Sequence, residues 1–366
     1  MKPRISPFEL TILMANFAMA ATLISLPQAL VQVGQQNTWM VPIIVFPLFL
    51  AIIILLLRKK AVSQEKFQRI FDINKSKFIS KAFVAVLSLF LILIFIRDLR
   101  ALIDFVSVSL LSRTPIEVIC VLSVVTLVYI TWSGIEVIAR MTVVLFLVFA
   151  GIVFCLPLLL ANEFQISNIQ PVLGADALPS ILQSTYLILP WIGEVIILLV
   201  FLMYVNPFEK SRKASIIGVS LGLLVLFVLL LSEIAVLGTG IIMVSTFPNY
   251  QLIQQINITD FLDRLDLVIV IFWIPTLFCK LALSLYCVNK TVCYFTKQQS
   301  TNVFILPISI ILGVLSIILF KNNIHHLEFS FFTWATLGIL FELIIIFMFL
   351  FITRFHLKVK TSQKGG

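Results

Sequence analysis

Two apolar stretches of the sequence each combine a Leu-Pro pair with groups that could bind a small solute. The first stretch, residues 20–27, carries the candidate ligand-binding residues Ala21, Thr22 and Ser25. The second, residues 189–194, carries Trp191, Gly193 and Glu194. Proline removes a backbone donor and clashes with the preceding turn, so it frees carbonyl groups that can bind a ligand. We therefore expect a solute site where two interrupted helices meet; the structural alternative is a simple proline kink.

Glu194 is the strongest chemical candidate because it lies near the middle of a long apolar run. An ionisable side chain at that depth in a membrane is expensive and is a functional hypothesis by default. Its carboxyl group could bind the ammonium of a substrate, or it could carry a proton. The structural alternative is a glutamic acid that forms a hydrogen bond to a neighbouring helix. We favour the functional interpretation.

Three other charged residues are candidates for coupling or gating. Lys280 lies about midway along another apolar run, where it could pair with a carboxylate or occupy the place of a coupling cation. Its alternative is a lysine that snorkels to the membrane surface. Glu136 and Arg140 are four residues apart at the predicted inner end of a span, a spacing that allows a helical ion pair. We interpret this pair as a structural or gating latch; the alternative is a local capping role.

Other chemistry finds little support in the sequence. Residues 97–104 contain four charged side chains at the predicted outer end of a span, which we interpret as interfacial. The pair His325-His326 with Glu328 is typical of a solvated loop rather than a metal site. The five cysteines form no Cys-x-x-Cys pair. No hydrolase, kinase, metalloprotease or Walker signature is present, so we expect no enzyme, no metal and no cofactor.

The elements that must position these residues are membrane-spanning helices. Hydrophobic residues make up 61% of the 366 positions and charged residues 12%, whereas an average soluble domain has about 25% charged residues. A span needs roughly 20 apolar residues. The composition therefore predicts an all-α membrane protein with about ten transmembrane helices, near residues 8–30, 39–57, 80–104, 116–132, 135–160, 180–205, 214–240, 265–288, 303–320 and 329–353.

The distribution of basic residues gives this arrangement a direction. With both termini inside, 20 of the 26 Lys and Arg residues fall on the inner side, which is the side that positive charge prefers. Eight of them lie in the predicted inner loop 58–81, which we expect to lie on anionic lipid. The formal net charge of +9 is thus explained by topology, so we expect no nucleic-acid partner.

Ten spans divide into two halves of five, near residues 8–160 and 180–353, within one polytopic domain of residues 1–366. An odd number of spans per half makes any internal repeat inverted, which is a common plan of secondary transporters. In such folds the first span of each half is broken at the substrate site, which again indicates spans 1 and 6. Ala214, Gly218 and Gly222 in span 7 have the spacing of small residues that lets two helices approach closely, within the chain or with a partner subunit.

Several dispersed landmarks together resemble one family. They occur in this order along the chain: Leu26-Pro27, Arg113-Thr114-Pro115-Ile116, Gly134-Ile135-Glu136 with Arg140, Pro171-Val172-Leu173-Gly174, residues 189–194, the basic run 210–213, and residues 261–266. The chain resembles the membrane B subunit of bacterial spore-germination receptors, a branch of the amino acid–polyamine–organocation transporter superfamily. The likeness covers nearly the whole chain in length and span pattern.

The resemblance implies a five-plus-five inverted-repeat fold with broken helices 1 and 6. It also implies a pocket between them for a germinant, an amino acid or a similar small nutrient. The implied partners are an A subunit and a lipoprotein C subunit in the inner membrane of the spore. One departure is that residues 20–22 read Ala-Ala-Thr, where the family usually has glycines. This puts an ordinary clamp for an α-amino-acid carboxylate in question.

Two other functions remain open on sequence alone. Glu194 and Lys280, as deep titratable groups, would also suit a proton-coupled amino-acid transporter. A conduit for solutes or ions is the third interpretation. Neighbouring genes that encode an A subunit and a lipoprotein would favour the receptor over the transporter.

Overall fold

The computed structural model describes residues 4–20, 22–58, 70–71, 78–174, 177–256, 265–298 and 302–362. Most of the predicted inner loop 58–81 lies outside these residues, and so does the candidate ligand-binding residue Ala21.

The first half of the described chain consists of helices joined by short connections. They are α1 (Pro7–Met19), α2 (Thr22–Gly34), the 3-10 helix η1 (Gln35–Met40), α3 (Val41–Leu56), α5 (Phe78–Phe105), the π-helical turn η2 (Val106–Leu110), α6 (Ile116–Trp132), α7 (Ile135–Leu159), η3 (Ala161–Glu163) and η4 (Ile166–Ile169).

The second half is also helical. Its elements are α8 (Ala177–Gly193), the 3-10 turn η5 (Glu194–Ile197), α9 (Leu198–Phe201), η6 (Leu202–Tyr204), η7 (Phe208–Lys210), α10 (Ser211–Val244), α11 (Pro248–Gln254), α12 (Leu265–Thr296), α13 (Ile305–Ile318), α14 (Asn323–Glu328), the π-helical turn η8 (Phe329–Thr333) and α15 (Trp334–Ser362). Each of the ten predicted spans overlaps one or more of these helices.

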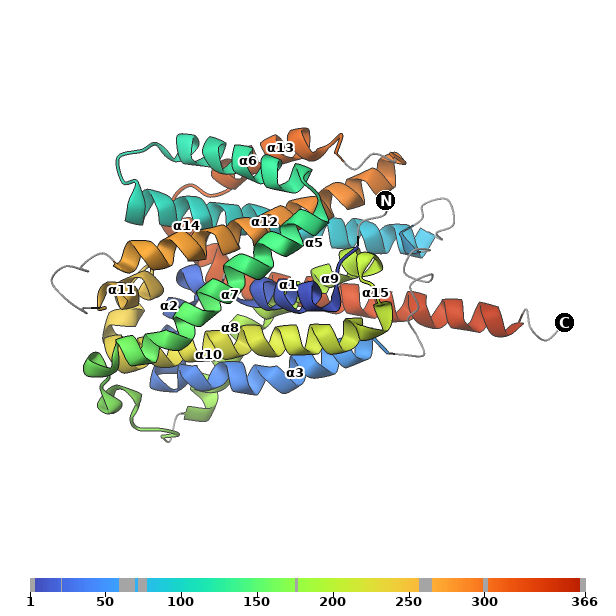
Figure 1. The fold of residues 1–366 in the computed structure, drawn as a ribbon. Helices are drawn as coiled ribbons and strands as arrows, with labels where there is room; N and C mark the ends of the chain where they lie inside the picture. Colours follow the sequence, from blue (N-terminus) through green and yellow to red (C-terminus); the bar gives the residue numbers. More distant parts are fainter. Residues whose placement is uncertain are drawn as a thin grey trace.

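By length and composition, seven helical segments within the described residues can cross a membrane. Three shorter apolar helices accompany them, at Pro7–Met19, Ile116–Trp132 and Ile305–Ile318. The chain is therefore an all-helical multi-pass membrane protein, and the number of ten crossings stays a prediction. In Figure 1 the start of α1 and the end of α15 lie at the same end of the bundle, as an even number of crossings requires.

The start of the chain is tied to the end of the sixth predicted span. Ser6 and Glu9 form a capping box at the start of α1, in which the Ser6 hydroxyl accepts from the Glu9 backbone at 3.2 Å. Just before it, the Ile5 amide donates to the Tyr204 carbonyl at 2.9 Å, and the Asn206 amide donates to the Ile5 carbonyl at 2.9 Å. These bonds fix the beginning of the first span beside the end of η6.

The close approach of α1 and α10 depends on two glycines. A Cβ atom at Gly218 would overlap the Thr11 carbonyl, and one at Gly222 would lie 2.7 Å from the Ala15 carbonyl. The predicted small-residue face is thus an internal contact, not a contact with a partner subunit. Because α10 packs this closely on α1, it supports the broken first span along its length.

Candidate functional site

The first span is interrupted between α1 and α2, within the predicted stretch 20–27, but Pro27 lies inside α2 and does not mark the interruption. The α-helix ends at Met19 and a new one begins at Thr22. The side-chain amide of Asn16, one turn before the break, donates to the Thr276 carbonyl of α12 at 3.0 Å. Ser25, beyond the break, is 2% exposed. The end of α1 is therefore fixed to α12 by a buried polar contact.

The sixth span changes its helical form at the predicted position. Pro190 lies in the last turn of α8, which ends at Gly193, and Glu194 begins the 3-10 turn η5. A proline cannot donate the backbone hydrogen bond of a regular α-helix, so this turn is easily rearranged. The interruption is a change from α to 3-10 geometry that directs Glu194 into the interior, where it is fully buried.

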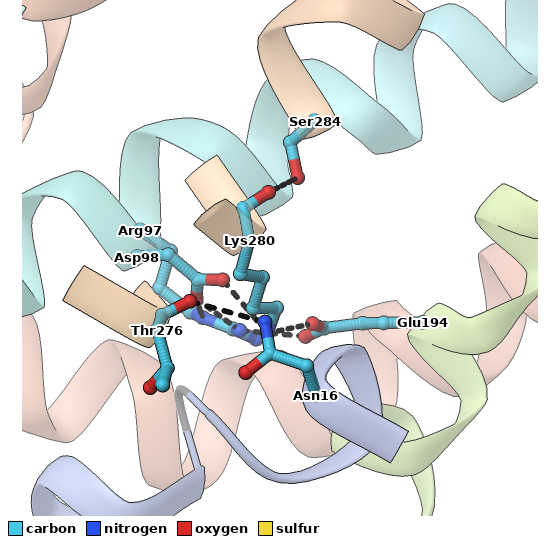
Figure 2. Close-up of polar contacts among 7 residues, drawn as sticks. All are labelled: Asn16, Arg97, Asp98, Glu194, Thr276, Lys280 and Ser284. Carbon is cyan, nitrogen blue, oxygen red and sulfur yellow. Dashed lines mark hydrogen bonds and ion pairs between the residues drawn. The ribbon is translucent and has the colours of Figure 1, made fainter. Parts of the chain in front are cut away.

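Glu194 lies within a ring of four buried charges, which we call the charge ring: Arg97, Asp98, Glu194 and Lys280. Arg97 Nη2 lies 2.6 Å from Glu194 Oε1 and 2.5 Å from Asp98 Oδ1. Lys280 Nζ lies 2.7 Å from Glu194 Oε2 and 2.9 Å from Asp98 Oδ2. Each cation thus contacts both carboxylates (Figure 2).

The charge ring is balanced and buried. Its side chains are at most 1% exposed, and they carry two positive and two negative charges. Burying a single ion costs several kcal/mol, and only close pairing with good geometry recovers that cost. The alternation of charges supplies this pairing, so the ring joins α5, η5 and α12 through interactions that depend on all four members.

Aromatic rings lie against both cations. The Arg97 guanidinium lies 3.9 Å from the ring centroid of Trp191 and 4.5 Å from that of Trp334. Lys280 Nζ lies 4.9 Å from the centroid of Phe17, near the end of α1. Such contacts stabilise a cation by electrostatic attraction to the face of the ring. Trp191, a candidate ligand-binding residue, is thereby placed against the charge ring.

The structure brings some of the predicted site residues together. Trp191, Gly193 and Glu194 lie at the α8–η5 junction, and Lys280 contacts Glu194 directly, so its predicted pairing with a carboxylate is confirmed. Snorkelling is wrong for Lys280, because its side chain is 1% exposed. Ala21 and the side chain of Thr22 lie outside the described residues. Their role in ligand binding stays a prediction.

The interfacial interpretation of residues 97–104 is wrong. All four charged side chains of this segment, Arg97, Asp98, Arg100 and Asp104, are at most 3% exposed. The reason is that α5 continues to Phe105 and η2 extends it by five more residues, so the segment lies inside a long helix. Adjacent opposite charges followed by further apolar residues were the signal that could have identified Arg97 and Asp98.

A second buried cluster lies further along α5. Arg100 Nε donates to Asp104 Oδ1 at 2.8 Å, and its Nη1 donates to the carbonyls of Ile317 and Phe320 near the end of α13. Asp104 Oδ2 lies 3.1 Å from His326 Nδ1. His326 is 2% exposed, so the prediction of a solvated loop is wrong for this residue. The cluster fixes α13 and α14 to α5.

Glu136 and Arg140 lie away from the charge ring, at the surface. Arg140 Nη2 is 4.0 Å from Glu136 and its Nε is 3.9 Å from Glu9, and the Arg140 side chain is 72% exposed. Glu136 Oε1 also accepts the Arg4 backbone amide at 2.6 Å. The predicted ion pair is thus present, but its N–O distance of 4.0 Å is long for a salt bridge. It links the N-terminal segment to α7, and a gating role stays a prediction.

Comparisons with known proteins agree with this architecture. A family model described as "Spore germination protein" matches residues 4–326 of the chain. The Bacillus subtilis (strain 168) protein YfkT is 30% identical over 320 residues, which cover 86% of this chain and 87% of YfkT. Spore germination protein KB of the same organism is 27% identical over 220 residues, which cover 59% of this chain and 58% of that protein.

A solved transporter has the same fold. The chain is similar to Mhp1, a nucleobase-cation-symport-1 family transporter in a closed conformation with bromovinylhydantoin bound, with a TM-score of 0.63 and 14% identity. The match covers 92% of this chain and 75% of that chain. At this identity the likeness concerns the fold alone.

Proposed function

This chain belongs to the spore germination protein family, a group of permease-type membrane proteins, and from that premise we propose that it is a nutrient-germinant-sensing subunit of a spore germination receptor. It would bind an amino acid or a similar small solute between spans 1 and 6. The fold would be a five-plus-five inverted repeat of ten spans. Its binding residues would be Ala21, Thr22, Ser25, Trp191, Gly193 and Glu194.

One observation carries this proposal: the carboxylate at the sixth-span break is held by two cations from other helices. Glu194 contacts Arg97 of α5 and Lys280 of α12. A solute with a charged group that enters here must compete with one of these pairs. These pairs hold the helices together. Replacing one of them by a ligand contact would therefore change the free energy of the ligand-bound helix arrangement relative to the ligand-free one. Differential binding of this kind is what a sensor requires.

The partners and location follow from the same premise. The chain would assemble with an A subunit and a lipoprotein C subunit in the inner membrane of the spore, with both termini inside. The support is that its relatives carry the names of spore germination proteins.

Germination of spores that carry Glu194→Gln tests the proposal. The substitution keeps the size of the side chain and removes its charge, so both ion pairs of Glu194 are lost. We expect the nutrient concentration for half-maximal germination to rise by about tenfold or more, the change for about 1.4 kcal/mol of lost binding. Glu209→Gln, in the surface turn η7, is the matched control and should leave the response unchanged. An unchanged dose response at normal protein level would remove Glu194 from the site.

A proton-coupled amino-acid transporter is the second candidate. It is favoured by the likeness to a solute transporter and by Lys280, a buried cation that contacts the sixth-span break. Purified protein in liposomes should then take up a labelled amino acid at a rate that depends on pH. Absence of uptake across the twenty common amino acids, in liposomes where the protein is folded, would contradict transport while leaving the sensor proposal intact.

A further inference from the structure

A fifth ionisable side chain lies beside the charge ring. Glu342 of α15 is 7% exposed, and its carboxyl group lies directly against the backbone of Gly193. A Cβ atom at Gly193 would overlap both oxygens of this carboxyl. Gly193 immediately precedes Glu194, so Glu342 is in contact with the break of the sixth span.

Helix packing holds Glu342 in this position. One turn earlier on α15, a Cβ atom at Gly338 would lie 2.5 Å from Pro190 Cβ. Gly338 thus makes room for Pro190, and Gly193 makes room for Glu342. Each helix contributes one glycine to the contact, so α8 and α15 approach closely. The Glu342 carboxyl group therefore lies against the backbone at the break.

Within the described part of the chain, Glu342 makes no salt bridge, although Arg97 lies within electrostatic range of it. Its Oε1 atom is buried and accepts no hydrogen bond there, and the ion pairs of Arg97 and Lys280 are made with Asp98 and Glu194. If Glu342 is ionised, the charge ring and Glu342 together hold three carboxylates and two cations, which leaves a net charge of −1. A buried charge without a partner is strongly unfavourable, so one bound monovalent cation would complete the balance.

We propose that Glu342, beside the Gly193 backbone, binds a monovalent cationic group. That group is either the ammonium of an amino-acid ligand or an alkali cation. The inference rests on the proposed function for the ligand's place at the sixth-span break. In this assignment the ammonium binds Glu342 instead of Glu194, because Glu194 already contacts two cations of the protein.

Thermal unfolding of the purified full-length protein tests this assignment. In the first series, each of the twenty common L-amino acids is compared with the carboxylic acid that lacks its amino group. In the second series, sodium or potassium chloride is compared with choline chloride at equal ionic strength. The wild type is compared with Glu342→Gln and with the matched control Glu233→Gln. Glu233 is also fully buried with both carboxyl oxygens lacking a hydrogen-bond partner in the described residues, but it lies on α10.

If the ligand is an amino acid, Glu342→Gln should weaken its binding by about tenfold or more, with no change for the acid that lacks the amino group. If the ligand is an alkali cation, sodium or potassium should stabilise the wild type over choline, and Glu342→Gln should abolish that stabilisation. Glu233→Gln should bind like the wild type in both cases.

Three results would overturn the assignment: a Glu342→Gln protein that binds like the wild type, an equal loss in Glu233→Gln, or a wild type that no cationic probe stabilises. If the Gln variant does not fold, Glu342→Asp replaces it. The shortened carboxylate should then bind the cationic probe more weakly, and equal binding overturns the assignment. Stabilisation by an alkali cation alone would retain the Glu342 site while contradicting an amino-acid ligand.

Discussion

Lys280 Nζ lies 2.7 Å from Glu194 Oε2, although the two residues are 86 positions apart and belong to α12 and η5. The contact joins the break in the sixth span to a helix that also holds the end of α1 through Asn16 and Thr276. Both interrupted spans therefore converge on α12. Lys280 therefore belongs to a helix that contacts both of them.

Replacing Lys280 by Met should destabilise the protein more than any change of a surface charge. The carboxylates of Asp98 and Glu194 would then share Arg97 alone, and breaking a buried pair typically costs about 3–5 kcal/mol. We expect a clearly lower midpoint of thermal unfolding for the purified variant. Lys290→Met is the control on the same helix, because Lys290 contacts the faces of Tyr204 and Tyr286 instead of a carboxylate.

The double variant Lys280→Met with Asp98→Asn sharpens this test. It removes one cation and one anion, which leaves Arg97 paired with Glu194. If charge balance stabilises the ring, the double variant should be more stable than Lys280→Met alone. Additive losses in this double-mutant cycle would contradict a coupled ring.

Leucine at Gly222 should disrupt the contact between α1 and α10. Even a Cβ atom at this position meets the Ala15 carbonyl at 2.7 Å, and backbone cannot move aside as a flexible side chain can. We expect loss of folded protein after detergent extraction, measured by the monodisperse fraction in size-exclusion chromatography. Gly151→Leu is the matched control, because a Cβ there meets nothing within 4 Å. Equal recovery of the two variants would show that this close approach is not needed.

Arg100→Met should loosen the end of α13 without unfolding the bundle. The Arg100 guanidinium donates to the Phe320 carbonyl at 3.0 Å and pairs with Asp104, so its removal leaves these acceptors without their donor. A cation near the C-terminal end of a helix also stabilises its dipole. Hydrogen exchange should become faster around residues 315–320. The exposed Arg113→Met should leave exchange there unchanged, and a matching increase in that variant would contradict the proposed tie.

Two members of the charge ring could be predicted from the sequence because an ionisable residue stands out in an apolar membrane span. Glu194 and Lys280 stand out in apolar runs, and the structure pairs them. The burial of Arg97 and Asp98 was not predicted, because a charge near the edge of an apolar run has the same sequence pattern whether the helix ends there or continues. His326 was missed for a related reason: a short polar segment between two spans reads as a loop even when a neighbouring helix covers it.

The sequence alone predicts the apolar helical segments and the change of helical form in the sixth span, where Pro190 and Glu194 lie; in the first span it indicates the stretch 20–27, but Pro27 itself lies inside α2. These predictions depend on local composition, since a stretch of about 20 apolar residues is stable in lipid wherever it packs. Which charges meet is set by the packing of helices that are distant in the sequence. Arg97, Glu194 and Lys280 lie far apart along the chain. Their distances therefore depend on helix packing, and on glycines such as Gly193 and Gly222 that let particular helices approach.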